Sequence, residues 1–416
     1  MLRHIKNALK SENFRTAAIF GISGLAFAAA NIILASVQTV ADYAVFTLSI
    51  AVITLFASLG QFGADGVVNR HELKPDARMF MRVFGTSAVA ATVAGLVTAR
   101  YYDIRSSLAV LLGIAIVSQS TIYFVAAYFR SRHDFRPALL TFNSSNYIIL
   151  AVAVAASIFG WQDALVPVAV VTCLLFGTAI WSVMNVRSRY VAVSSAYAYH
   201  WREAIAYVSI AGSGAVLLQL ERLVTPKFLT LVDLATLGVL LAIVGPPFRL
   251  LHMTLGYVLL PKLRKARTAA ERNSLIVREI VVALCLLVPS WIVTWYLVPI
   301  LEALFFDQKY QLTGELVVSV IVAGTIKVFS GIGKASLDAV ASTRHLEVMA
   351  VVVWVGVAVS VAGAYFGARY GLAGIVYAVS LGWIVRLAGA VVLVSRSWQS
   401  HREITPAKPH ADSLLP

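Results

Sequence analysis

Apolar stretches of about 20 residues recur along the whole chain, each long enough to cross the ~30 Å hydrocarbon layer of a membrane. The composition agrees, because 59% of the 416 residues are hydrophobic and only 13% are charged, against about 25% charged in a soluble domain. Segments of about ten alternating residues, the pattern of a membrane β-barrel, do not occur. We therefore predict an all-α, polytopic membrane protein with twelve transmembrane helices, at 15–37, 43–64, 79–99, 107–129, 138–159, 164–184, 203–222, 233–260, 277–300, 316–338, 346–366 and 371–394.

Lysine and arginine are distributed unequally between the two sides of this predicted membrane. If both termini are cytoplasmic, the inner segments hold 24 Lys and Arg and the outer loops hold 5. Such a positive-inside bias predicts an N-in, C-in topology. The net charge of +14 is then mostly an orientation signal facing anionic membrane lipids, and we expect no nucleic-acid partner.

Two parts of the chain are similar to each other at a nearly constant spacing. Residues 39–53 align with 230–244 at an offset of 191, and Arg132-His133 matches Arg344-His345 at an offset of 212. We therefore predict two six-helix lobes, 1–200 and 201–396, followed by a disordered cytoplasmic tail at 397–416. Six helices per lobe give both lobes the same orientation, and transporters with such parallel repeats bind substrate between them. The identical residues in the first match are Thr39/Thr230, Asp42/Asp233, Ala44/Ala235 and Ala51/Ala242.

Three stretches carry a resemblance to a known family. "ADYAVFTLSIAVITLFASLGQFGADGVVNR" (41–70) resembles the start of the polysaccharide-biosynthesis transporters, the Wzx-type O-antigen and exopolysaccharide flippases. "FDQKYQLTGELVVSVIVAGTIKVFSGIGKASLDAVASTRHLEVM" (306–349) is similar to their tenth and eleventh helices, and "RYGLAGIVYAVSLGW" (369–383) to their twelfth. The chain departs from the family pattern at Ala44, where the family usually has Gly.

This resemblance implies a fold of the MOP superfamily, the superfamily that also contains the multidrug and toxic compound extrusion (MATE) transporters. It implies a function in moving polyprenyl-diphosphate-linked oligosaccharide from the cytoplasmic to the outer leaflet of the bacterial inner membrane. The implied partners are that lipid-linked glycan, glycosyltransferases and a polysaccharide polymerase.

Five cations interrupt the predicted helices. A cation at the centre of a membrane helix costs about 2.5–3.5 kcal/mol on insertion scales, and such residues normally face a bundle interior or a water-filled cavity. Because Arg and Lys bind phosphate oxygens, we predict that these cations bind the diphosphate of the substrate. They are Arg249, Lys327, Lys334, Arg222 and Arg386. Asn31 aligns with Arg222 at the offset of 191, and Asp338 stands four residues after Lys334, so both are predicted as polar cavity residues.

Three of these charges also have an ordinary explanation. Arg222 ends the seventh span, where its side chain can reach the outer interface. Lys334 can pair with Asp338 alone, and Arg386 can donate to carbonyls of a neighbouring helix. The Pro-Pro pair at 246–247 beside Arg249 removes two amide donors. It predicts either a kink or a helix broken at the site, and a break is tolerated only where the backbone lines a cavity.

Other motifs indicate neither catalysis nor metal binding. "GIGKAS" (331–336) lacks the Mg-binding Ser or Thr of a phosphate-binding loop, and "HELKPD" (71–76) lacks the second His of a zinc protease. We expect no catalytic residue, no metal ion and no cofactor. "NSSN" (143–146), near the start of the fifth span, is expected to form hydrogen bonds between helices.

Two other functions compete with the flippase. A MATE-type antiporter exchanges organic cations for H⁺ or Na⁺ and needs a deep carboxylate. The first predicted helix has no acid and the second only Asp65 at its inner end, which counts against an antiporter. A membrane enzyme that acts on polyprenyl-linked sugars would need a sizeable outer loop. Here the longest one, 301–315, has about 15 residues, so we do not expect an enzyme.

Overall fold

The computed structural model of the chain describes residues 12–73, 76–189, 201–266, 268–340 and 342–403, and this part contains helices and no strand. Each of the twelve predicted spans coincides with one helix or, at 138–159, with a pair of helices. The helices are α2 (Glu12–Val37), α3 (Val40–Gly60), α4 (Ala64–His71), α5 (Ala77–Tyr102), α6 (Ser106–Ser131), α7 (Phe135–Phe142), α8 (Ser144–Phe159), α9 (Leu165–Arg189), α10 (Trp201–Phe228), α11 (Leu231–Lys265), α12 (Ala269–Phe305), α13 (Gly314–Val340), α14 (Thr343–Gly367) and α15 (Gly371–Glu403), with a 3₁₀ turn at Ala368–Tyr370 between the last two.

Ten segments of the described chain are long and apolar enough to cross a membrane, and eleven if the bent pair α7–α8 is one span. The last of them, Arg344–Arg396, contains both α14 and α15. These two helices pack against each other, so they are separate crossings. The prediction of an all-α, multi-pass membrane protein is confirmed.

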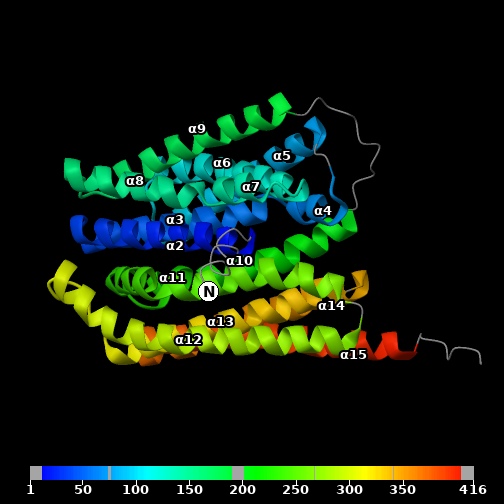
Figure 1. The fold of residues 1–416 in the computed structure, drawn as a ribbon. Helices are drawn as coiled ribbons and strands as arrows, with labels where there is room; N and C mark the ends of the chain where they lie inside the picture. The colour runs from blue at the N-terminus through cyan, green and yellow to red at the C-terminus, as the bar shows by residue number, and fades with distance from the viewer. Residues whose placement is uncertain (1–11, 74–75, 190–200, 267, 341, 404–416) are drawn as a thin grey trace, which may run out of the picture.

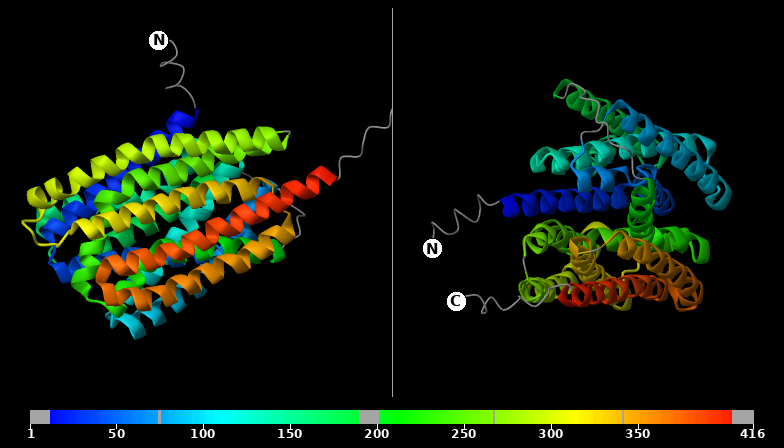
Figure 2. Two further views of the ribbon diagram at one scale, coloured as in Figure 1. Left: turned by 90° about the horizontal axis from the view of Figure 1, so that it is seen from below. Right: turned by 90° about the vertical axis from the view of Figure 1, so that its right-hand side faces the viewer.

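The helices form two bundles that lie one against the other (Figure 1). The N-terminal bundle consists of α2–α9 and the C-terminal bundle of α10–α15, and the same separation is visible when the molecule is viewed from its end (Figure 2). Contacts between them run mainly from α10 and α11 to α2 and α3. The predicted boundary near residue 200 lies in 190–200, outside the described residues.

The same cap begins α3 and α11, the second helix of each predicted repeat. The Thr39 hydroxyl accepts from the Asp42 amide, and the Thr230 hydroxyl accepts from the Asp233 amide. A Thr side chain that satisfies a free amide in the first turn fixes where a helix begins. The identical Thr and Asp residues of the sequence match therefore occupy equivalent places in the two bundles.

The predicted fifth span is broken at Asn143. α7 and α8 meet there at an angle of 43°. The break coincides with a buried network, in which the Ser23 hydroxyl of α2 donates to Asn143 Oδ1 (2.9 Å) and accepts from Asn146 Nδ2 (2.6 Å). Polar side chains of this kind join membrane helices. The expectation of interhelical hydrogen bonds from "NSSN" is confirmed.

Two other expectations, one about a break within α11 and one about the end of α15, differ from the structure. α11 is a single helix through Pro246 and Pro247, so the predicted alternative of a broken helix is wrong. The helix continues although both prolines lack an amide donor, and membrane helices tolerate such prolines when other groups satisfy the freed carbonyls. α15 extends to Glu403, so residues 397–403 of the predicted disordered tail are helical, and the remainder lies outside the described residues.

Candidate substrate site between the bundles

Arg249 lies on α11 where the two bundles meet. Its side chain is exposed, and its guanidinium carbon lies 5.5 Å from the centre of the Phe27 ring of α2. Tyr123 of α6 and Arg222 of α10 are within electrostatic range of it. A guanidinium stacked over an aromatic face gains about 0.5–2 kcal/mol. Arg249 is therefore surrounded by groups from both bundles.

The sequence predicted that Arg222 is the last residue of its helix. In the structure α10 continues for six more residues, to Phe228. Arg222 is half-buried, and one of its terminal nitrogens donates to Gln219 Oε1 at 3.1 Å, while its buried Nε has no partner in the described chain. Tyr43 of α3 is within electrostatic range. Arg222 therefore points toward the N-terminal bundle with part of its hydrogen-bonding capacity unused.

Asn31 serves the packing of the N-terminal bundle. It is buried on α2, donates to the Phe27 carbonyl at 2.8 Å and accepts from the Tyr43 hydroxyl at 3.2 Å. Both polar ends of the side chain are thus satisfied within the bundle. Asn31 orients Tyr43, the residue that lies near Arg222.

Lys327 forms an ion pair that sequence analysis missed. Its Nζ lies 2.7 Å from Glu221 Oε1, and the two side chains are 15% and 1% exposed, so solvent screens them little. The second carboxylate oxygen of Glu221 is buried and has no hydrogen-bond partner among the described residues. The argument against an antiporter considered only the first two predicted helices, and Glu221 of α10 is a deep acid outside them. Glu221 stood beside Arg222 inside a predicted span, which was the one sequence signal available.

His252 connects α11 to the same ion pair. Its Nδ1 is 2.8 Å from the Lys327 carbonyl oxygen, and its ring stands edge-to-face with Trp383 of α15 at 6.3 Å. A Cβ atom on Gly331 would lie 2.7 Å from His252 Nδ1. Gly331, four residues after Lys327 on α13, thus makes room for an imidazole of the chain itself.

The remaining cations are each held within the C-terminal bundle. Lys334 pairs with Asp338, four residues along the same helix, as one of the predicted explanations required. Arg386 is only 4% exposed, its Nη2 donates to the Ile210 carbonyl at 3.4 Å, and its guanidinium carbon lies 5.6 Å from the Trp383 ring centre. Arg386 thus has the carbonyl contact to a neighbouring helix that its ordinary explanation describes, although its buried Nη1 has no hydrogen-bond partner among the residues described.

At the end predicted to be external, the α12–α13 connection joins the bundles. Lys309 Nζ donates to the carbonyls of Ala35, at 2.9 Å, and of Gln38, and the Tyr310 hydroxyl also donates to the Ala35 carbonyl at 2.9 Å. Partial burial lowers the pKa of Lys309. These donors satisfy carbonyls at the end of α2, where no further helical turn supplies amide donors.

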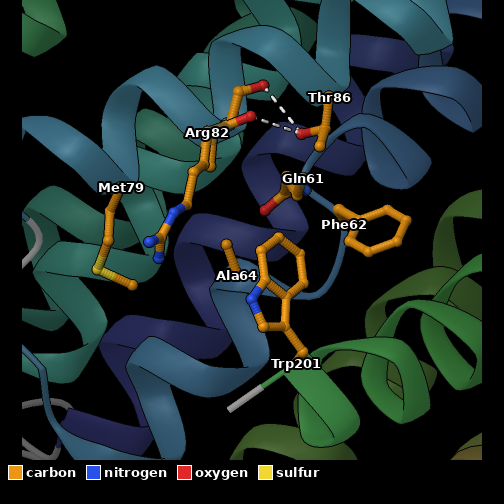
Figure 3. Close-up of a pocket in the computed structure, with 8 residues that line it drawn as sticks. Gln61, Phe62, Ala64, Met79, Arg82, Thr86 and Trp201 are labelled. Carbon is orange, nitrogen blue, oxygen red and sulfur yellow. Dashed lines mark hydrogen bonds between the residues drawn. The ribbon is translucent and has the colours of Figure 1, made fainter. Parts of the chain in front are cut away.

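At the predicted cytoplasmic end, α4 and α10 close the interface. Gly63 has φ +73°, and a Cβ there would lie 2.2 Å from the Ala204 carbonyl oxygen, so only glycine fits. His71 Nε2 is 2.8 Å from Glu203 Oε2. Trp201, the first residue of α10, lies against residues at the end of α3 and on α5 (Figure 3), around a void of only about 10 Å³. The bundles are thus in contact at both ends.

The five cations differ in how well their charge is compensated. With the carboxylates Glu221 and Asp338 the group has a net charge of +3. Lys327 and Lys334 form ion pairs with carboxylates, and Arg386 and Arg222 donate hydrogen bonds to neutral oxygen atoms. Arg249 stacks on the face of Phe27, and no carboxylate of the described chain forms an ion pair with it. Arg249 is therefore the charge with most capacity left for an anion. No set of three metal-ligating residues occurs in the described chain.

No protein-family model and no curated protein matches this sequence. Solved structures do match the fold. The lipid II flippase MurJ in an inward closed conformation has a TM-score of 0.60 and 13% identity, over 93% of this chain and 89% of that chain. The MATE multidrug transporter DinF-BH, solved as a complex, has a TM-score of 0.58 and 11% identity, over 92% and 95%. The Vibrio cholerae MATE transporter VcmN, solved as a mutant, has a TM-score of 0.56 and 13% identity, over 95% and 98%.

These identities are low, so the likeness concerns the fold. It extends over nearly the whole of each chain, and the matching structures include a lipid II flippase as well as MATE transporters. The helix arrangement seen in Figures 1 and 2 therefore resembles that of these solved transporters.

Proposed function

We propose that this protein is a flippase that moves a polyprenyl-diphosphate-linked oligosaccharide from the cytoplasmic to the outer leaflet. The observation that carries the proposal is Arg249, an exposed guanidinium at the meeting of the two bundles with no carboxylate partner in the described chain. A diphosphate supplies the negative charge that this position lacks, and guanidinium binds phosphate oxygens in pairs. Arg222, with its unused Nε, is the second contact in this proposal.

The remaining cations have a supporting part in this proposal. Lys327, Lys334 and Arg386 are each held by a group of the C-terminal bundle. Glu221 and Asp338 neutralise Lys327 and Lys334, whereas Arg386 bonds to a neutral carbonyl and so raises the positive potential around the site without direct contact with the phosphates. In low-dielectric surroundings such fixed charges act over longer distances than they do in water.

A cation-coupled antiporter of the MATE type is the second candidate, and Glu221 is the observation that favours it. A carboxylate that is 1% exposed, with one oxygen on Lys327 and the other without a partner, is a possible binding point for a proton or metal cation. The two functions place the essential charge on different residues, Arg249 in the flippase and Glu221 in the antiporter. Single substitutions can therefore distinguish them.

The test uses a deletion strain that carries each variant, with surface glycan, lipid-linked intermediates and membrane protein level measured together. We expect Arg249→Ala to abolish surface glycan at a normal protein level, because removal of an uncompensated deep charge does not hinder insertion. Arg249→Lys should retain part of the activity if charge suffices, and little if paired phosphate contacts are needed.

Arg369→Ala is the matched control. Arg369 is exposed near the predicted outer surface, and its guanidinium carbon lies 5.9 Å from the Phe366 ring centre. The Arg369→Ala variant therefore loses the same charge and the same kind of aromatic contact as Arg249→Ala. We expect normal glycan from this variant. Normal glycan from Arg249→Ala, or a strain that becomes sensitive to lipophilic cationic dyes while its glycan is intact, would refute the flippase.

A further inference from the structure

A second pocket lies away from the bundle interface, on the side of the N-terminal bundle that faces away from the C-terminal bundle. It has a volume of about 350 Å³ and is formed by α6, α7, α8 and α9. Figure 1 places α9 on the side of this bundle that is farthest from the C-terminal bundle. The pocket is therefore separate from the candidate substrate site, and transport through the bundle interface does not explain it.

The wall of this pocket combines a cation, an unsatisfied hydroxyl and apolar groups. Arg136, at the start of α7, is exposed, and no carboxylate of the described chain forms an ion pair with it. Ser182 of α9 is 1% exposed, and its Oγ has no hydrogen-bond partner within the part of the chain that the structure describes. A buried hydroxyl without a partner is unfavourable by about 1–3 kcal/mol, so a ligand atom that reaches it would be stabilising.

The position of the pocket indicates what kind of molecule enters. Arg136 follows the α6–α7 turn, which the charge bias places on the cytoplasmic side. Trp181, on the rim, is 64% exposed and lies eight residues before the end of α9, so it is about 12 Å from that end. Leu140, also on the rim, is 42% exposed. Tryptophan at the membrane interface beside apolar side chains is typical of a surface that contacts lipid.

We propose that this pocket binds the phosphate head group of an anionic phospholipid of the cytoplasmic leaflet. Arg136 contacts the phosphate, the Ser182 hydroxyl donates to an oxygen of the head group or glycerol, and the acyl chains leave the pocket past Leu140 and Trp181. Basic pockets between membrane helices on the cytoplasmic side bind anionic lipid head groups by this combination of charge and hydrogen bonding. The proposal is independent of the transported substrate.

The test is native mass spectrometry of the purified full-length protein in detergent, titrated with dioleoyl phosphatidylglycerol or with dioleoyl phosphatidylcholine, which has the same chains and no net charge. We expect the wild type to retain phosphatidylglycerol preferentially. Arg136→Gln should lower its retention by about fivefold, the effect of one basic residue at an anionic membrane surface. Thr178→Trp, which fills the pocket from α9, should lower the retention of both lipids.

Arg105→Gln is the matched control, because Arg105 is an exposed arginine in the α5–α6 connection on the predicted outer side. It should leave retention unchanged, and the circular dichroism of every variant should match the wild type. Equal retention of the two lipids, or an unchanged Arg136→Gln, would overturn the proposal. Displacement of the lipid by inorganic phosphate at millimolar concentration would assign the pocket to free phosphate instead.

Discussion

The Glu221–Lys327 pair gives the sharpest test of how charge is arranged in the C-terminal bundle. Glu221→Gln leaves the Lys327 ammonium, only 15% exposed, beside a neutral amide. Loss of one member of a buried ion pair typically destabilises a protein by about 3–5 kcal/mol, because the other charge remains buried without compensation. We expect Lys327→Met to be destabilising by a similar amount, since Glu221 is more deeply buried still.

The double variant Glu221→Gln/Lys327→Met should be more stable than either single variant, because it leaves no unpaired charge. The measurement is thermal unfolding of the detergent-solubilised protein, followed by tryptophan fluorescence. Glu347→Gln is the control, since its partner Arg202 has a side chain that is 78% exposed, and we expect no measurable change. A Glu221→Gln variant as stable as the wild type, or a double variant less stable than both singles, would refute a compensated buried pair.

The same variants also separate the two candidate functions. In the flippase, Glu221 and Lys327 neutralise each other and do not contact the substrate, so the double variant should retain glycan transport. In a cation-coupled antiporter, Glu221 binds the coupling ion, so the double variant should lose transport even though it is stable. A stable, correctly inserted double variant without transport would thus favour the antiporter.

Two further predictions concern the ends of the molecule. Tyr310→Phe removes a 2.9 Å hydrogen bond to the Ala35 carbonyl and should lower the free energy of unfolding by about 0.5–1.5 kcal/mol, measured as a lower unfolding temperature. An undiminished unfolding temperature would mean that this contact does not join the bundles. A cysteine at Gln308 should react with a membrane-impermeant maleimide in intact cells, and one at Asn273 only after permeabilisation. The reverse result would invalidate the predicted topology.

The success of sequence analysis depended on how far apart the interacting residues are in the chain. The spans were predictable because the hydropathy of a segment depends only on that segment's own residues. The Lys334–Asp338 pair was predictable because its members are one helical turn apart. Glu221 and Lys327 are 106 residues apart, so nothing in either segment indicates the other. The break at Asn143 likewise coincides with a network centred on Ser23, 120 residues away. In each such case the missing information was which helices are neighbours.

The contact between Arg249 and Phe27 links ligand binding to the movement of the bundles under the proposed flippase function. Arg249 belongs to the C-terminal bundle and Phe27 to the N-terminal bundle, so their 5.5 Å contact is also a contact across the interface. A bound diphosphate offsets the positive charge that attracts the ring, so it weakens the Phe27 contact, although it binds the edge of the guanidinium and not the face that lies over the ring. A ligand shifts a conformational equilibrium only by its difference in affinity for the two states. Since the state with separated bundles has already lost the Phe27 contact, the anion binds that state more tightly, and its arrival favours separation of the bundles at the site.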